Sequence, residues 1–93
     1  MATTQRFPLG QLVATPGALA ALAGVGATPL PYLQRHAAGD WGDVDQDDQR
    51  ANDQALTEGE RLLSVYQLPD GTRLWIITER DHSLTTVLLP AEY

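Results

Sequence analysis

The chain has 93 residues, of which 43% are hydrophobic, and it contains no cysteine. This length leaves room for one domain with a modest core, and the absence of cysteine excludes a disulfide framework or a thiolate metal site. Six arginines against twelve acidic residues give a net charge of −6, and no apolar run is long enough to cross a membrane. We expect one domain over residues 1–93, located in the cytoplasm because the first residues show no charged-then-apolar leader pattern.

The negative charge is concentrated in one segment. Residues 40–60 hold eight acidic residues against Arg50 alone, a local balance of −7, so the remaining residues sum to +1. Because no basic stripe is present, the sequence excludes a protein that binds DNA through its grooves. A local acidic patch attracts the basic surface of a protein partner. The candidate partner-binding residues in this segment are Trp41, Asp43, Asp45, Asp47 and Asp48.

The first two-thirds of the chain predict one short strand followed by three short helices. Residues 10–14 indicate the strand. Thr15-Pro16 and Thr28-Pro29 each indicate a helix start, because threonine caps free N–H groups and proline loses no hydrogen bond at the first helical position. Glycines and an aspartate cap set the remaining boundaries. The predicted helices cover residues 16–23, 28–39 and 47–57.

The C-terminal third predicts three antiparallel strands at residues 62–68, 72–78 and 84–89. Asp70-Gly71 is a strong hairpin signal, and a second turn is expected at Arg80–Ser83. We therefore predict an α+β fold. Its short helices pack on one face of a three- to four-stranded antiparallel sheet, to which residues 10–14 can add an edge strand.

The faces of this sheet follow from the first turn. If two residues form its centre, Tyr66 lies opposite Trp75, and both share a mixed face with Ser64, Thr86 and Glu79. Tyr66 and Trp75 are then candidates for contact with a partner. The other face is uniformly aliphatic and is the predicted core: Leu63, Val65, Leu74, Ile76, Val87 and Leu89.

A candidate acid–base group lies at the end of the second predicted helix. His36 and Arg35 end this helix, and Asp40 follows across a glycine. The helix dipole favours a positive imidazole at this end, so an Asp–His pair beside an arginine suits general acid–base chemistry on a phosphate. The alternative is structural: His36 and Asp40 tie down the loop by hydrogen bonds while Trp41 fills the core.

The second turn resembles the end of a barnase-type ribonuclease, where a hydrophobic strand leads to an acid, a histidine turn and a threonine-bearing strand. Glu79 and His82 occupy the matching positions. The resemblance implies RNA cleavage, whose acid–base and phosphate-binding roles could be filled by Glu79, by His82 or His36, and by Arg80 or Arg73. The version that we carry forward takes His36 as the acid–base group, Glu79 as the base, and Arg35 or Arg80 on the phosphate. This alternative function requires Glu79 and His36 to reach one substrate. An ordinary polar turn is the competing interpretation.

The acidic run starts like a calcium loop but does not continue as one. Asp43, Asp45 and Asp47 occupy positions one, three and five of such a loop. Position six is Asp48 instead of glycine, and position twelve is Gln54 instead of a bidentate glutamate. We therefore predict no specific calcium site, and the two histidines alone predict neither a zinc site nor a cofactor.

Several blocks of residues carry a resemblance that spans nearly the whole chain. In order, they are Val13–Ala18, Arg35-His36, Gly39–Gly42, Ser64–Tyr66, Trp75–Glu79, Thr85–Pro90 and Glu92-Tyr93. Together they resemble a family of small proteins found on bacterial plasmids, phages and genomic islands, whose members are usually labelled hypothetical or plasmid-related. The resemblance implies a setting on mobile DNA and names no activity. His82 stands where the family pattern has arginine, which moves the acid–base hypothesis toward His36.

The leading hypothesis from the sequence is a small non-catalytic accessory protein of bacterial mobile elements that binds an unidentified protein partner. Its contact surface would be the acidic segment 40–60 or the sheet face of Tyr66 and Trp75. Homodimerisation through an exposed edge strand is a further option. The small ribonuclease or toxin described above is the alternative.

Overall fold

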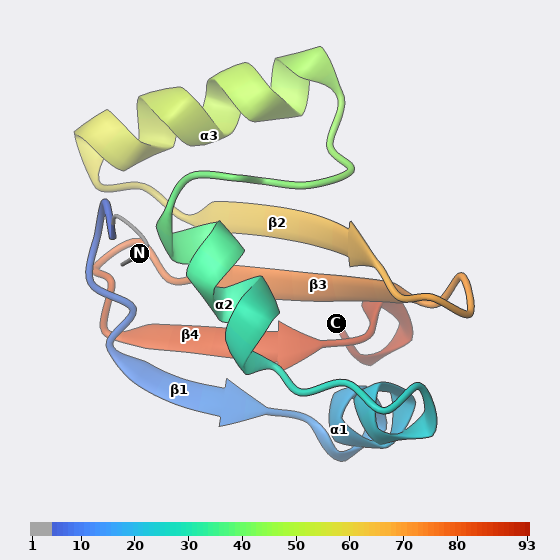
Figure 1. The fold of residues 1–93 in the computed structure, drawn as a ribbon. Coiled ribbons are helices and arrows are strands. Elements are labelled where there is room, and N and C mark those ends of the chain that lie inside the picture. The colour runs from blue at the N-terminus through green and yellow to red at the C-terminus, as the bar shows by residue number, and fades with distance from the viewer. Residues whose placement is uncertain (1–4) are drawn as a thin grey trace.

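In the computed structural model, which describes residues 5–93, two of the three helices lie over one face of a four-stranded sheet and the third lies along one of its edges (Figure 1). The predicted α+β class is confirmed, and the predicted helices and strands are all present. In chain order the elements are β1 (Gln11–Ala14), α1 (Pro16–Gly24), α2 (Leu30–Ala37), α3 (Gln46–Glu58), β2 (Leu62–Gln67), β3 (Arg73–Thr78), β4 (Leu84–Leu88) and the 3-10 turn η1 (Pro90–Glu92).

The sheet has the strand order β1-β4-β3-β2. Strands β2, β3 and β4 form the predicted antiparallel meander, but β1 pairs with β4 in the parallel direction, with Gln11 beside Leu84. The prediction of a wholly antiparallel sheet was therefore wrong for this strand. All three helices and two strands separate β1 from β4, and a connection of this length lets the chain return in the same direction.

The pairing of β2 with β3 differs from the prediction by one residue. Tyr66 lies opposite Leu74 and not opposite Trp75. The hairpin loop has three residues, 69–71, and Gly71 closes it with a left-handed φ of 90°. Such three-residue loops end in a left-handed residue, whereas the two-residue turn would have given the predicted register. A slip of one residue moves every side chain of the strand to the other face.

The main core lies between the sheet and the helices α1 and α2. On the sheet, Leu74, Ile76 and Val87 belong to it as predicted, while Leu63 and Val65 lie on the opposite face with Trp75. Tyr66, predicted on the mixed face, is a core residue with 1% of its surface exposed. The buried members of this cluster are Ala18, Leu22, Leu33, Tyr66, Leu68, Leu74, Ile76 and Val87.

A second, smaller cluster holds α3 against the β2 edge of the sheet (Figure 1). Its buried members are Phe7, Trp41, Ala55 and Leu62. Trp41 comes from the loop between α2 and α3, and its indole N–H donates a hydrogen bond to Asp53 at 2.9 Å. Helix α3 therefore packs through a narrow strip at the sheet edge, as expected for a peripheral helix.

Candidate functional site

His36 is the most deeply buried titratable group of the candidate acid–base set. It lies in the last turn of α2, and its ring has no exposed surface. Its Nδ1 atom is 2.5 Å from the Ser64 hydroxyl and its Nε2 atom is 2.9 Å from the Thr78 hydroxyl. The Thr78 hydroxyl is in turn hydrogen-bonded to the Thr85 hydroxyl at 2.8 Å, and the Thr85 hydroxyl donates to the Leu9 carbonyl at 2.6 Å.

The number of donors and acceptors at each residue determines where the protons lie in this series of hydrogen bonds. Because the single proton of Thr85 goes to a backbone carbonyl, its oxygen accepts from Thr78. Thr78 in turn accepts from His36, which places the imidazole proton on Nε2. Ser64 then donates to the unprotonated Nδ1. With a neutral imidazole, every hydrogen-bonding group of this network has a partner. The network links α2 to the sheet, and we call it the polar brace.

The surroundings of His36 leave no route for a substrate. Phe7 and Trp41 pack edge-on against the imidazole at centroid distances of 5.3 and 5.7 Å. Burial lowers the pKa of His36 from 6.5 to about 4. A general acid or base must reach the proton that it transfers. His36 therefore cannot take the role that the acid–base hypothesis gave it, and the structural alternative describes it better.

The predicted Asp–His pair is replaced by a surface ion pair. Asp40 accepts from the Arg35 Nε atom at 2.7 Å and also from the Gly42 N–H at 3.3 Å. These contacts, that of Arg35 first, lower the pKa of Asp40. The Arg35 guanidinium also lies 4.5 Å from the centre of the Tyr66 ring. Both charged side chains are about half exposed, so this pair fixes the loop more than it stabilises the fold.

The remaining ribonuclease candidates, Glu79 and Arg80, directly follow Thr78 at the end of β3. Arg80 lies in the turn between β3 and β4, where it pairs with Glu60 at 3.5 Å. A polar hollow contains Arg35 and Asp40, but neither His36 nor Glu79 lines it. That hollow therefore does not bring the five candidate catalytic residues together, and the burial of His36 opposes its acid–base role.

Two of the predicted partner-binding aromatic residues are internal. Trp41 is 3% exposed and Tyr66 is 1% exposed, and the Tyr66 hydroxyl donates to the Asp40 carbonyl at 2.6 Å. Trp75 is half-buried on the opposite face of the sheet, in edge contact with Tyr93. The proposed aromatic face does not exist, because the register separates Tyr66 from Trp75.

The four predicted aspartates, in contrast, are all exposed around the start of α3. Asp45 caps the helix by accepting from the Asp48 N–H at 2.8 Å, and Asp47 and Asp48 lie in the first turn. Between residues 5 and 93, the only ion pairs are Arg35–Asp40 and Arg80–Glu60. We call Asp43, Asp45, Asp47 and Asp48 the acidic surface; none of the four has a cationic partner in the described chain.

Sequence reasoning missed how the outer edge of β2 is covered. The side-chain amide of Asn52 in α3 takes the place of a neighbouring strand's backbone. It donates to the Leu63 carbonyl at 2.7 Å and accepts from the Leu63 N–H at 3.1 Å. Two residues on, the Val65 N–H donates to Trp41 at 3.0 Å and its carbonyl accepts from Asp43 at 2.6 Å. The chain itself thereby satisfies the outward polar groups of β2.

Replacing Asn52 by alanine should lower the free energy of unfolding by about 2 kcal/mol, because two partly buried backbone groups of Leu63 lose their partner. Urea denaturation followed by tryptophan fluorescence measures this loss. Gln54→Ala, on the exposed face of the same helix, is the matched control and should change stability by less than about 0.5 kcal/mol. Equal losses in the two variants would contradict the role of Asn52.

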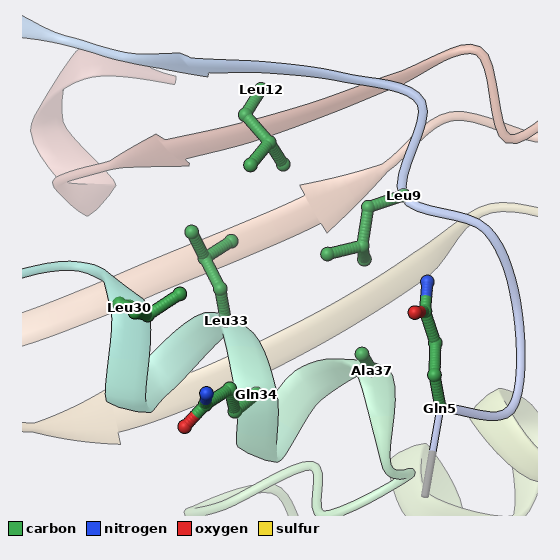
Figure 2. Close-up of a pocket in the computed structure, with 7 residues that line it drawn as sticks. All are labelled: Gln5, Leu9, Leu12, Leu30, Leu33, Gln34 and Ala37. Atoms are coloured by element: carbon green, nitrogen blue, oxygen red, sulfur yellow. The ribbon is translucent and has the colours of Figure 1, made fainter. Parts of the chain in front are cut away.

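An apolar groove between β1 and α2 was also missed. Figure 2 shows Leu12 of β1 and Leu33 of α2 pointing toward each other across it, with Leu9 beside them. The groove has a volume of about 400 Å³. Leu12 and Leu30 are 51% and 58% exposed, although both are aliphatic. The only sequence signal was the uncharged strand at residues 10–14, which does not show that one edge stays open.

Comparison of the chain with protein-family models, with curated proteins and with solved structures gave no match in any of the three. Within residues 5–93, no three histidine or acidic side chains converge as metal ligands would. The helices of this part of the chain are all too short or too polar to cross a membrane. The functional argument therefore depends on the two surfaces just described.

Proposed function

We propose that this protein is a non-catalytic binding protein whose acidic surface recognises a basic patch on a protein partner. The observation that carries the proposal is that Asp43, Asp45, Asp47 and Asp48 are exposed together without cationic partners in the described chain. Carboxylates grouped in this way attract and orient arginine or lysine side chains of an approaching protein.

The packing of α3 supports this role. The helix buries only Asn52 and Ala55, so most of its surface faces solvent. The helix is also fixed in place, because Asp45 caps its start and the Trp41 side chain is hydrogen-bonded to Asp53 near its middle. A partner would therefore meet carboxylates on a preformed helix instead of ordering a loop, which lowers the entropic cost of binding.

The cellular setting belongs to the same proposal. The family resemblance supports a protein of bacterial mobile elements that acts in the cytoplasm of the host. The partner would then be a host or element protein with an exposed basic patch. The ribonuclease alternative has no comparable support, since His36 is enclosed and neither His36 nor Glu79 lines the hollow that holds Arg35 and Asp40.

The test compares two variants with equal net charge. Asp43→Asn, Asp47→Asn and Asp48→Asn together neutralise the acidic surface and leave the capping Asp45 in place. Asp70→Asn, Glu79→Gln and Asp81→Asn together remove the same charge in the strand turns. Each purified protein is immobilised, exposed to a bacterial lysate, and its bound proteins are quantified by mass spectrometry.

We expect at least one basic protein that the wild type and the turn variant retain equally. The acidic-surface variant should retain it about tenfold less, because several interfacial charge pairs are lost together. A thermal melt of each variant confirms that α3 is still folded. If no captured protein distinguishes the two triple variants, the acidic surface is not the binding site.

A further inference from the structure

The two edge strands of the sheet, β2 and β1, differ in whether other parts of the chain bond to their outward backbone groups. The outer edge of β2 is covered by Asn52 and by the loop at Trp41–Asp43. On β1, the N–H groups of Gln11 and Thr15 donate to Ser83 and Val87, both toward β4. Since backbone groups alternate in direction along a strand, those of Leu12 and Ala14 point away from the sheet. We call this side of β1 the open edge.

Nothing in β1 protects the open edge from pairing. Natural proteins protect exposed edges with charged residues, prolines, bulges or a covering element. Strand β1 consists of Gln11, Leu12, Val13 and Ala14, none of which is charged or proline, and the first three are exposed. The strand is also held firmly, because Thr15 just after it bonds to Glu92 at 2.5 Å and caps α1. The open edge is therefore a preformed strand-pairing site.

The charge distribution indicates which partner fits. Residues 1–39 contain no acidic residue, and their only charged side chains are Arg6 and Arg35. All twelve acidic residues lie within 40–93, and α3 is on the far side of the sheet from β1 (Figure 1). Two copies that meet at β1 therefore place their acidic surfaces at opposite ends of the assembly. The charge of the acidic surfaces then opposes this association only weakly, whereas Glu92, which bonds to Thr15, lies close to β1.

We propose that β1 pairs with β1 of a second copy, antiparallel, around a twofold axis at Val13. Leu12 of each copy then exchanges both backbone hydrogen bonds with Ala14 of the other. The two four-stranded sheets become one continuous sheet, and its ends are the covered β2 strands. The contact is isologous and closed, so association stops at two chains. This inference is independent of the proposed function.

Side chains complete the interface on both faces. On the helix face, the exposed Leu12 residues of the two copies lie near the axis, and Leu30 and the groove of Figure 2 flank them. On the other face, Val13 meets its own symmetry mate in a non-hydrogen-bonded pair, where Cα atoms are about 4.5 Å apart. The pairing thus buries the aliphatic groups that the single chain leaves in water.

The first test is a disulfide across the axis. The chain has no cysteine, so Val13→Cys introduces one thiol per copy at the position where the proposed geometry suits a disulfide. Ala51→Cys, on the exposed face of α3, is the matched control. Under mild oxidation, the Val13→Cys protein should convert to a two-chain species well before the control does. Equal rates of cross-linking would overturn the proposal.

The second test measures mass in solution. Light scattering and sedimentation at concentrations on the order of 100 μM, where a micromolar Kd gives nearly complete association, should give the mass of two chains. Leu12→Glu should return one chain, whereas Leu19→Glu, at a similarly exposed leucine of α1, should stay at two. Wild type with the mass of one chain would overturn self-pairing, and would leave the open edge to an extended segment of another protein.

Discussion

Replacing His36 by alanine is expected to lower the free energy of unfolding by about 3 to 5 kcal/mol. The change leaves a ring-sized cavity beneath the sheet. It also removes the acceptor of the Ser64 hydroxyl and the donor to the Thr78 hydroxyl, both of which are fully buried. Urea denaturation followed by tryptophan fluorescence measures the loss.

The control is the other histidine. His82 lies in a turn with a left-handed φ of 56°, which asparagine tolerates, so His82→Asn should cost less than about 1 kcal/mol. A His36→Ala protein as stable as this control would contradict the stabilising role of the polar brace. A ribonuclease role would make the opposite prediction, with His36→Ala changing activity and leaving stability nearly intact.

The same imidazole should make the protein less stable in mild acid. Burial lowers the pKa of folded His36 to about 4, whereas the unfolded chain has an ordinary value near 6.5. Between these values the unfolded state binds one more proton than the folded state, so stability rises with pH through this window. It should therefore fall by about 3 kcal/mol as pH drops from 6.5 to 4, and stay level above pH 7.

Unfolding free energies at pH 7, 6 and 5 test this slope. His36→Gln, which has no titrating group, should lose it, and His82→Asn should keep it. The exposed carboxylates whose pKa is lowered, including Asp40 and Glu92, have ordinary values of 3.8 and 4.5, so their loss of stability begins only near the acidic end of this window and continues below it. A wild-type slope that persists in His36→Gln would assign the effect to another group.

Local signals were sufficient to predict the helices and strands. Thr15 accepts the Ala18 N–H at 3.1 Å, as expected of a threonine before a proline-started helix, and Gly59 ends α3 with a left-handed φ of 74°. Such boundaries depend on a few neighbouring residues and need no tertiary contact. For that reason the fold class followed from the sequence, although the direction of β1 did not.

The register of β2 required information that the pattern does not contain. Asp-Gly occurs in two-residue and three-residue hairpin loops, and here Pro69 is included in the loop. The resulting shift brings Ser64 and Tyr66 to the helix face, where Ser64 bonds to His36. Polar residues that had suggested a reactive face are instead a buried brace. A histidine beside hydroxyl groups has the same composition in either role, and only burial distinguishes them.

The covering of β2 and the exposure of β1 were equally inaccessible from the sequence. Asn52 is one of several polar residues on α3, and no local rule distinguishes the one whose amide pairs with Leu63. Likewise, the exposure of Leu12 depends on where α2 lies over the sheet (Figure 1). Both features arise from contacts between distant segments, and both determine which edge can accept another strand.

Replacing Gly42 by alanine is expected to cost about 4 kcal/mol. Gly42 has a left-handed φ of 76°, and an added Cβ would lie only 2.1 Å from the Val65 carbonyl oxygen. To relieve this overlap the loop must move from β2, which breaks the hydrogen bonds of Val65 to Trp41 and Asp43. Urea denaturation at pH 7 measures the change.

Two other glycines separate the causes of this loss. Gly26 has a similar φ of 68° but no atom within 4 Å of an added Cβ, so Gly26→Ala should cost only about 1 to 2 kcal/mol. Gly24, at the end of α1, has neither restriction, and Gly24→Ala should be neutral or slightly stabilising. If Gly42→Ala lost no more stability than Gly26→Ala, the loop at Trp41–Asp43 could move without cost, and its hydrogen bonds to β2 would contribute little to stability.

The Gly42→Ala protein also tests how the covered edge at β2 limits pairing at the open edge of β1. Moving the loop from β2 uncovers the Val65 N–H and carbonyl, so each chain then has two edges that accept a strand. With both edges available, pairing no longer closes at two chains and can propagate as an open series. Light scattering of folded Gly42→Ala should therefore show masses above two chains that increase with concentration. Gly26→Ala, whose strain lies far from β2, should remain at two, and equal masses in both variants would mean that the loop is not what closes that edge.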